Sequence, residues 1–134
     1  MSVSSRFVIL VHDHPFVHWD LLVEHGAVLR SWRLLECPER WRHGFAASLP
    51  ADAIGDHRLA YLDYEGPVSG ERGCVARWDH GSAVWLDDDE EAIRLRLFGE
   101  RLRGELAFIR PPGTAHVTAT FLRSAEQSST SESH

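Results

Sequence analysis

The feature that most constrains this chain is a series of short apolar runs, each with a period of two and each bounded by turn residues. In one of them, Ile93, Leu95 and Leu97 alternate with Arg94 and Arg96. Side chains alternate faces along a β-strand, so this pattern predicts a half-buried strand. Because such runs recur without a convincing helical period, we predict an all-β fold, a compact antiparallel β-barrel or a closely related sandwich, with short connecting turns.

Turn residues divide the sequence into expected strands and connections. The strands are expected over residues 7–12, 18–24, 28–35, 58–64, 73–78, 84–86, 93–97, 105–110 and 117–123. A turn at Asp79–Gly81 separates two of them, and a long connection runs from Glu36 to Asp56 because proline and glycine interrupt it repeatedly. That connection holds the one expected helical turn, Ala51–Ile54. Its residues 40–43 would either lean over a substrate or lie exposed, and we expect exposure.

Length and composition indicate one domain. The chain has 134 residues, 43% of them hydrophobic, which suffices for a core without disulfide bonds. We predict a barrel domain over residues 1–123 and a disordered, Ser-rich tail over residues 124–134. Cys37 and Cys74 form no paired ligand motif, so both are expected as reduced thiols in or near the core. Neither a membrane-spanning apolar segment nor a signal peptide is present, so we expect a cytoplasmic protein.

The net charge limits how the chain could bind nucleic acid. At pH 7 the formal charge is -6, which gives no general attraction to a polyanion. Any contact with nucleic acid would therefore be local, at one site, and a duplex-coating protein is disfavoured.

A predicted hairpin near the N-terminus brings together candidate metal ligands. On the strand that starts at His18, the apolar Trp19 and Leu21 face the core, so His18 and Asp20 share the other face. The hairpin returns His12 beside them, which completes a set of two imidazoles and one carboxylate with open coordination positions. Such ligands suit manganese, iron or zinc. The alternative is a solvated hairpin tip with a local hydrogen bond, since short ligand patterns give false positives.

Several further motifs, in order, carry a resemblance to a known family. The matching stretches are His12-Asp13, His18-Trp19-Asp20-Leu21, Ser31-Trp32, Asp56-His57 through Tyr61 to Gly66, Gly73 to Gly81, and Leu97 to Gly104. Together they resemble the 3′-phosphoesterase domain of bacterial ATP-dependent DNA ligase D, the multidomain ligase of non-homologous end joining. The resemblance covers residues 6 to 110, nearly the whole expected domain.

The resemblance implies a function and a set of site residues. It implies that His12, His18 and Asp20 hold a divalent cation, typically Mn²⁺ with Zn²⁺ or another transition metal as alternatives, and that His57 and Tyr61 lie beside the reacting phosphate. The family trims 3′ ends, removing a terminal ribonucleoside and then a 3′-phosphate. The substrate would be a nucleic-acid 3′ end or a small phosphate ester, with ligase or end-joining proteins as partners and no membrane. Taken without the family, His57 would be a loop-edge histidine and Tyr61 a core aromatic.

The chain departs from the family where phosphate-binding basic residues are expected. Leu22 replaces an arginine on the same strand face as Asp20, Glu36 replaces a lysine, and Leu49 replaces a second arginine. Lost charge-assisted bonds of this kind are worth roughly 1.5–3 kcal/mol each. Candidate replacement cations are Arg30, Arg33, Arg40, Arg42 and Arg58.

Two function hypotheses therefore stand, with a third behind them. The first is an active metal-dependent phosphoesterase. The second is a catalytically weakened metal-binding accessory or nucleic-acid-binding module that keeps the barrel, in which Leu22→Arg would restore activity. The third is a metal-dependent oxygenase that uses the same ligand set, which only the metal ligands themselves would support.

Overall fold

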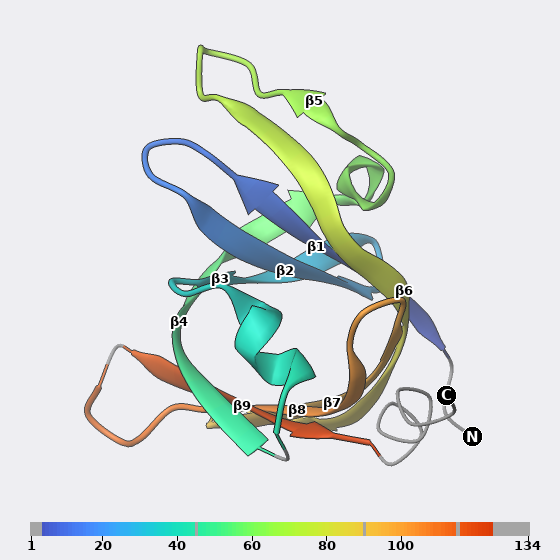
Figure 1. Cartoon of the computed structure of the whole chain (residues 1–134), viewed down its shortest axis with the longest axis vertical. Helices are drawn as coiled ribbons and strands as arrows, with labels where there is room; N and C mark the ends of the chain where they lie inside the picture. The colour runs from blue at the N-terminus through green and yellow to red at the C-terminus, as the bar shows by residue number, and fades with distance from the viewer. Residues whose placement is uncertain (1–3, 45, 90, 115, 125–134) are drawn as a thin grey trace.

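A computed structural model describes residues 4–44, 46–89, 91–114 and 116–124, and these form strands joined by turns and two short 3₁₀ helices (Figure 1). The elements are β1 (Ser5–His12), β2 (His18–His25), β3 (Val28–Leu34), η1 (Pro38–Arg42), β4 (Ala46–Arg58), η2 (Leu59–Leu62), β5 (Gly66–Pro67), β6 (Cys74–Asp88), β7 (Ala92–Gly99), β8 (Arg103–Ile109) and β9 (Val117–Arg123). The expected all-β class is confirmed.

The sheet closes on itself, and this confirms the predicted antiparallel barrel. Neighbouring strands follow the order β1-β2-β3-β4-β9-β8-β7-β6, and β6 then pairs back with β1. Every pairing is antiparallel, and the short β5 adds to the edge of β6 beyond the closed circuit (Figure 1). Closure leaves the barrel strands without unpaired edges, and it fixes which side chains face inward.

The inside of the barrel is filled by alternate residues of each strand. On β7, for example, Ile93, Leu95 and Leu97 are buried in the main core, as their period of two predicted. Trp41 of η1 packs into the same core, with its ring stacked on Phe121 at 5.5 Å between centroids. Trp41 was expected to be exposed, and that was wrong because the tryptophan completes the core while its neighbours in residues 40–43 face solvent.

A second, smaller core covers the outer face of β1 and β2. It contains Val8, Leu10, Leu22, Leu29, Leu62 and Val75. Leu62 comes from η2, which lies over this face of the sheet in Figure 1. As a result, β1 and β2 are buried on both faces, and the face that carries His18 and Asp20 is not the open polar face that the sequence predicted.

Three other sequence predictions were wrong. Ala51–Ile54 is not a helical turn but part of β4, which pairs with both β3 and β9 and occupies much of the expected connection. Of the expected strand over residues 58–64, Arg58 is the last residue of β4, and η2 follows it because Leu62 packs into the second core. The expected turn at Asp79–Gly81 lies inside the continuous strand β6.

Asp79 shows why β6 does not turn there. Its carboxylate is buried and accepts backbone hydrogen bonds from Arg101 and Leu102, both at 2.9 Å, as well as from His80. It therefore holds the turn that follows β7 and does not form one of its own. Burial raises the pKa of the Asp79 carboxyl above its ordinary value, and the backbone donors oppose that rise only in part.

The remaining expectations concern the thiols, the tail and the membrane. Cys37 is partly buried and Cys74 is exposed, both as free thiols, so the expectation of a site in or near the core was wrong for Cys74. The predicted disordered tail falls almost entirely on residues 125–134, outside the described residues. No helix in the described part of the chain is long and apolar enough to cross a membrane.

Candidate metal centre

The hairpin of β1 and β2 places the three predicted metal ligands together. His12 ends β1 and lies directly opposite His18, which begins β2, with their ring centroids 4.9 Å apart. Asp20 lies two residues further along β2, on the same face. Each of the three offers a ligand atom, and these atoms all lie within 4.8 Å of one another. The alternation of side chains along the hairpin strands therefore places these three residues together, as the sequence predicted.

The turn between β1 and β2 is held by the first residue of β6 and by the glycine before it. The carboxylate of Asp13 accepts a hydrogen bond of 2.8 Å from the backbone N–H of Cys74. Gly73, with φ of +75°, lies so close that an added Cβ would fall 2.1 Å from the same carboxylate oxygen. A side chain at this position would push the hairpin turn away, so the ligands on either side of the turn depend on this glycine.

In each histidine one ring nitrogen hydrogen-bonds to a backbone carbonyl, and the other ring nitrogen is left to bind a metal. His18 Nδ1 lies 2.9 Å from the carbonyl oxygen of Phe16, so Nδ1 carries the proton and donates. His12 Nε2 lies 2.7 Å from the carbonyl oxygen of Arg72, so in His12 the Nδ1 atom keeps the lone pair. Backbone carbonyls that fix a histidine in this way are typical partners of metal ligands.

The lone pair of His18 is the clearest sign of a missing partner. Its Nε2 atom is buried and accepts no hydrogen bond from any described residue. The nearest acidic oxygen, Asp20 Oδ2, is 3.4 Å away. A buried nitrogen without a partner costs about 1–3 kcal/mol, and a cation between His18 and Asp20 would remove that cost. The donor set of two imidazoles and one carboxylate thus fits a divalent transition metal.

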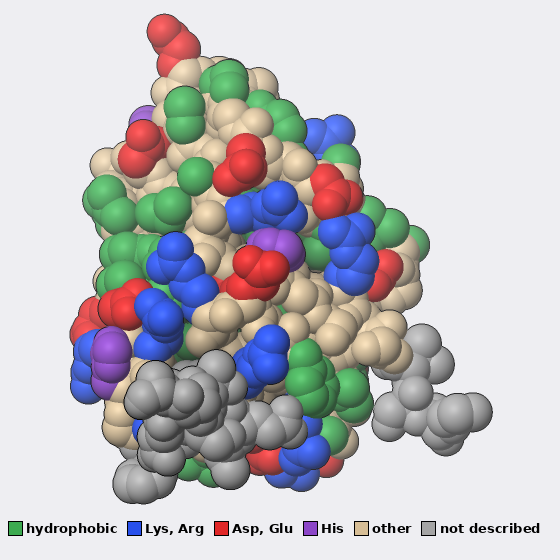
Figure 2. Space-filling model, turned by 45° about the vertical axis from the view of Figure 1, so that its right-hand side comes forward, with side chains coloured by type: hydrophobic (Ala, Val, Ile, Leu, Met, Phe, Trp, Pro, Cys, Tyr) green, Lys and Arg blue, Asp and Glu red, His purple; other side chains and the backbone are tan. Residues whose placement is uncertain are grey.

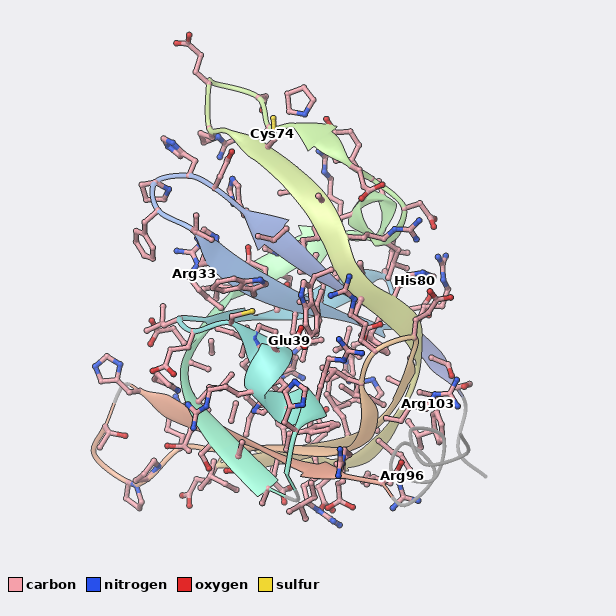
Figure 3. The ribbon with its side chains drawn as sticks, in the orientation of Figure 1. Arg33, Glu39, Cys74, His80, Arg96 and Arg103 are labelled. Carbon is pink, nitrogen blue, oxygen red and sulfur yellow. The ribbon has the colours of Figure 1, made fainter. Side chains whose placement is uncertain are left out.

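Arg33 is the cation that the fold brings to this cluster. Asp20 and Arg33 lie opposite each other on β2 and β3, and Arg33 Nε is 3.5 Å from Asp20 Oδ1. Figure 3 labels Arg33 among the side chains of this part of the sheet. The Arg33 side chain is 31% exposed, so it can still reach a ligand in solvent. Arg33 is one of the arginines proposed as replacement cations, and it contacts a predicted metal ligand.

His57 and Tyr61 lie close together although they come from different elements. His57 is on β4 and Tyr61 is in η2, so the two residues do not share a strand face. Their rings nevertheless meet edge to face, 5.5 Å apart. Both side chains are partly buried, which excludes a purely core role for Tyr61.

Ser31 positions His57, a role that the sequence analysis did not identify. Its hydroxyl donates to the carbonyl of Leu29 at 3.0 Å and lies 2.8 Å from His57 Nδ1. Because that hydroxyl proton is already used, Nδ1–H of His57 donates to Ser31, and Nε2 is left as the atom that accepts or delivers a proton. The signal was present in the Ser31-Trp32 motif, but the pairing depends on a register shift between β3 and β4 that no local pattern reveals.

Ion pairing ties η2 to the barrel. Arg6 at the start of β1 contacts Asp63, directly after η2, with an N–O distance of 2.7 Å. That hydrogen bond lowers the pKa of the Asp63 carboxyl and raises the pKa of the Arg6 guanidinium. The segment that carries Tyr61 is thereby fixed to the same strand that carries His12.

The positions that are basic in the resembling family are occupied without strain in this chain. Leu22 is fully buried in the second core and Leu49 in the main core. Glu36 is exposed and pairs with Arg40 at 3.1 Å. The two leucines are therefore structural residues here, and no cation could replace either without loss of a core contact.

Charged side chains of both signs share the face of the molecule that Figure 2 shows. Over the face shown in Figure 2, arginines and acidic side chains lie interspersed, without a broad basic patch.

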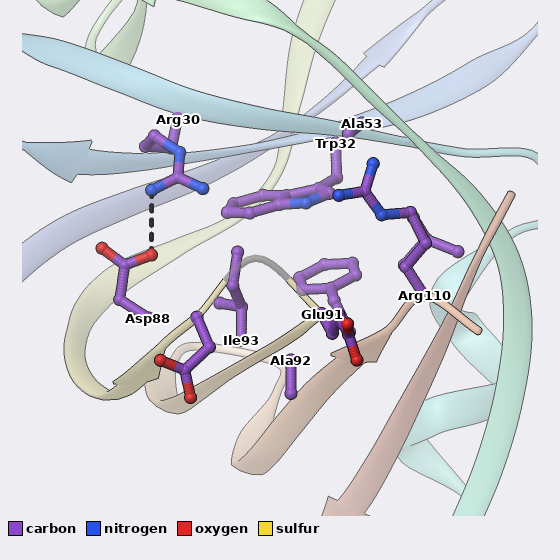
Figure 4. Close-up of a pocket in the computed structure, with 11 residues that line it drawn as sticks. Arg30, Trp32, Ala53, Asp88, Glu91, Ala92, Ile93 and Arg110 are labelled. Atoms are coloured by element: carbon purple, nitrogen blue, oxygen red, sulfur yellow. Dashed lines mark hydrogen bonds and ion pairs between the residues drawn. The ribbon is translucent and has the colours of Figure 1, made fainter. Parts of the chain in front are cut away.

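A pocket of about 330 Å³ lies away from the candidate metal centre. In this pocket Trp32 stacks on Phe108, and Arg30 pairs with Asp88 at 3.2 Å (Figure 4). Arg30 is thus engaged there, and it is not a replacement cation at the metal centre.

Comparison with known proteins agrees with the geometry. The family model of the DNA Ligase D 3′-phosphoesterase domain matches residues 11–110. The multifunctional non-homologous end joining protein LigD of Pseudomonas aeruginosa is 32% identical over 113 residues, which are 78% of this chain and 13% of that protein. The protein of the same name from Mycobacterium bovis is 32% identical over 117 residues, 82% of this chain and 15% of that protein. The chain thus spans about one seventh of the length of these curated relatives.

Proposed function

Because this chain belongs to the DNA ligase D 3′-phosphoesterase family, we propose that it is a divalent-metal-dependent phosphoesterase that heals 3′ ends of DNA during repair. It would hydrolyse 3′-phosphate or 3′-ribonucleotide ends and leave a 3′-hydroxyl for a polymerase or a ligase. The proposed partners are a DNA end and the ligase or end-joining proteins that act on it, in the cytoplasm.

One observation carries the proposal. The Nε2 atom of His18 is buried beside Asp20 and His12 with no hydrogen-bond partner among the described residues, and all three ligand atoms lie within 4.8 Å of one another. We propose that these residues hold Mn²⁺, with Zn²⁺ as the alternative, since imidazole and carboxylate together suit both. When bound, such a metal polarises the phosphate and lowers the pKa of a coordinated water.

His57 and Tyr61 are the proposed catalytic residues. Because Nδ1–H of His57 donates to Ser31, Nε2 is the atom that faces the substrate chemistry. In the imidazolium form, Nε2–H would protonate the leaving oxygen or donate to a phosphate oxygen. The Tyr61 hydroxyl would donate to the same phosphate group from η2. Arg33, beside Asp20, is the proposed source of the positive charge that Leu22, Glu36 and Leu49 do not supply.

The alternative is a binding or accessory module that has lost catalysis. It is favoured by the two leucines, because they fill cores where the family has cations. The two functions differ in catalysis. Both would bind metal and DNA ends, but only the phosphoesterase would hydrolyse the 3′ end.

The deciding experiment pairs elemental analysis with a release assay. Purified protein is assayed for bound metal and for manganese-stimulated release of phosphate from a 3′-phosphorylated primer-template, with a panel of small phosphate esters alongside. His12→Ala is the matched control, and Leu122→Ala controls for handling because Leu122 is an exposed β9 residue. Turnover that does not exceed the His12→Ala background refutes the phosphoesterase, and absence of metal refutes both functions.

A further inference from the structure

A second pocket lies directly beside the proposed catalytic pair. It has a volume of about 250 Å³ and is lined by Arg58, Tyr61, Tyr64, Pro67, Val68 and Ser69, which we call the tyrosine pocket. One wall is the segment from the end of β4 through η2, and the opposite wall is β5 and the residues after it. Tyr61 is shared with the candidate site, where its ring meets His57.

From this geometry we infer that the tyrosine pocket binds an unpaired nucleobase, that of the 3′-terminal nucleotide whose 3′ oxygen carries the reacting phosphate. The inference rests on the proposed function, because that function places the phosphate at His57. It adds to that function a contact with the base of the terminal nucleotide.

The lining chemistry matches a flat heteroaromatic ring. Tyr61 and Tyr64 meet edge to face with centroids 5.8 Å apart, and Arg58 lies over the Tyr61 ring at 5.9 Å. Phenol rings and guanidinium planes are the groups on which proteins stack unpaired bases. A base must leave the duplex stack to enter such a pocket, and a single-stranded end allows this at least cost.

The pocket is already held in shape. The Tyr64 hydroxyl donates a hydrogen bond to the carbonyl oxygen of Pro67, so the ring is held against the opposite wall of the pocket. Gly66 allows this fold-back, because its φ of +138° is unfavourable for other residues and an added Cβ would lie 3.2 Å from the Tyr64 hydroxyl. A pre-formed ring loses little conformational freedom when a ligand stacks on it.

The charges around the pocket also favour this ligand. Within the described residues Arg58 has no acidic partner, while the nearby Asp63 and Glu65 are engaged by Arg6 and by the backbone N–H of Arg77. The guanidinium is therefore available to the carbonyl groups and ring nitrogens of a base. In a chain of net charge -6, a stacking contact supplies affinity that general electrostatic attraction does not.

The test compares two single-stranded oligonucleotides that end in a 3′-hydroxyl, so that binding is measured without turnover. One ends in a normal nucleotide and the other in an abasic tetrahydrofuran residue, and the dissociation constants are measured by fluorescence anisotropy with the full chain and Mn²⁺. We expect the abasic strand to bind about 5- to 150-fold more weakly, the range that one base–aromatic stack supports.

Variants assign this preference to the pocket. In Tyr64→Ala the ratio of the two dissociation constants should fall close to one, and in Tyr64→Phe it should persist because the ring remains. Arg58→Ala, at an exposed position, should reduce the ratio without disturbing the fold, and Leu122→Ala should keep it. Equal binding of both strands by the wild type overturns the inference, as does a full ratio in Tyr64→Ala or, should that variant not fold, in Arg58→Ala.

The same measurements separate this inference from the proposed function. A chain that prefers the normal strand but releases no phosphate would refute catalysis and keep the nucleobase pocket. A chain that releases phosphate but binds both strands equally would keep catalysis and refute the pocket.

Discussion

Replacing His18 with leucine would separate metal binding from folding. In the metal-free protein no residue that the structure describes hydrogen-bonds to the buried Nε2 atom of His18, which costs about 1–3 kcal/mol, and leucine removes that cost. The substitution also removes the hydrogen bond from Nδ1 to the Phe16 carbonyl, worth about 0.5–1.5 kcal/mol. The two effects oppose each other, so we expect the metal-free His18→Leu protein to be as stable as the wild type or about 1–2 kcal/mol more stable.

The response to metal should differ completely between the two proteins. A metal at 100 times its dissociation constant stabilises the folded wild type by about 2.7 kcal/mol, or roughly 10 °C in Tm for a domain of this size. His18→Leu should show no such rise, because one of three ligands is gone. Thermal unfolding followed by circular dichroism, in EDTA and in increasing Mn²⁺ or Zn²⁺, measures both quantities, with Leu122→Ala as the matched control.

Two outcomes would refute this reasoning. A Tm rise with metal that persists in His18→Leu would show that the cation binds elsewhere. A loss of more than about 3 kcal/mol in the metal-free variant would show that the nitrogen is not unsatisfied in the folded protein, since removing an unpartnered group cannot cost that much.

Three further predictions test the surroundings of the site. Leu22→Arg should not restore activity but destabilise the fold by about 3–5 kcal/mol in urea unfolding, because it empties a buried apolar position and buries a charge; wild-type stability with increased phosphate release would contradict this. Ser31→Ala should lower kcat about fivefold through loss of the hydrogen bond that orients His57, and an unchanged kcat would refute the positioning role. Asp79→Asn should destabilise the protein by about 1–3 kcal/mol at pH of about 4 and by less at neutral pH. The raised pKa of Asp79 means that the folded state holds the carboxyl proton more tightly than the unfolded state does. The stability that Asp79 contributes therefore falls as pH rises from its ordinary pKa through the raised pKa. Urea unfolding at both pH values measures the effect of the substitution, and a larger destabilisation at neutral pH than at acidic pH would refute this direction.

The parts of the fold that the sequence predicted are those governed by local periodicity. β7 lies between two antiparallel neighbours and buries one face. The alternation of Ile93, Leu95 and Leu97 with polar residues therefore predicts both the strand and its buried face. In β4, by contrast, Pro50 and Gly55 interrupt the pattern, and the strand forms because β3 and β9 pair with it on both sides. Such pairing over long sequence separations overrides local propensity and is not visible in the sequence.

The same distinction applies to the candidate site. His12, His18 and Asp20 lie within nine residues on one hairpin, so strand alternation was enough to bring them together. The contact between His57 and Ser31 instead depends on a register shift between two strands, and the tyrosine pocket depends on where η2 and β5 meet. Features of that kind follow from the closed fold as a whole, and the sequence gives no local sign of them.

The burial of β1 on both faces has a consequence for how the chain can vary. In a saturation mutagenesis experiment, tolerance along β7 should rise and fall at every second position, since buried and more exposed residues alternate there. In β1 no such alternation in tolerance should occur, because four consecutive residues are all at most 2% exposed: Phe7, Val8, Ile9 and Leu10. Polar replacements would be rejected at all four positions, whereas the outer positions of β7 would accept them.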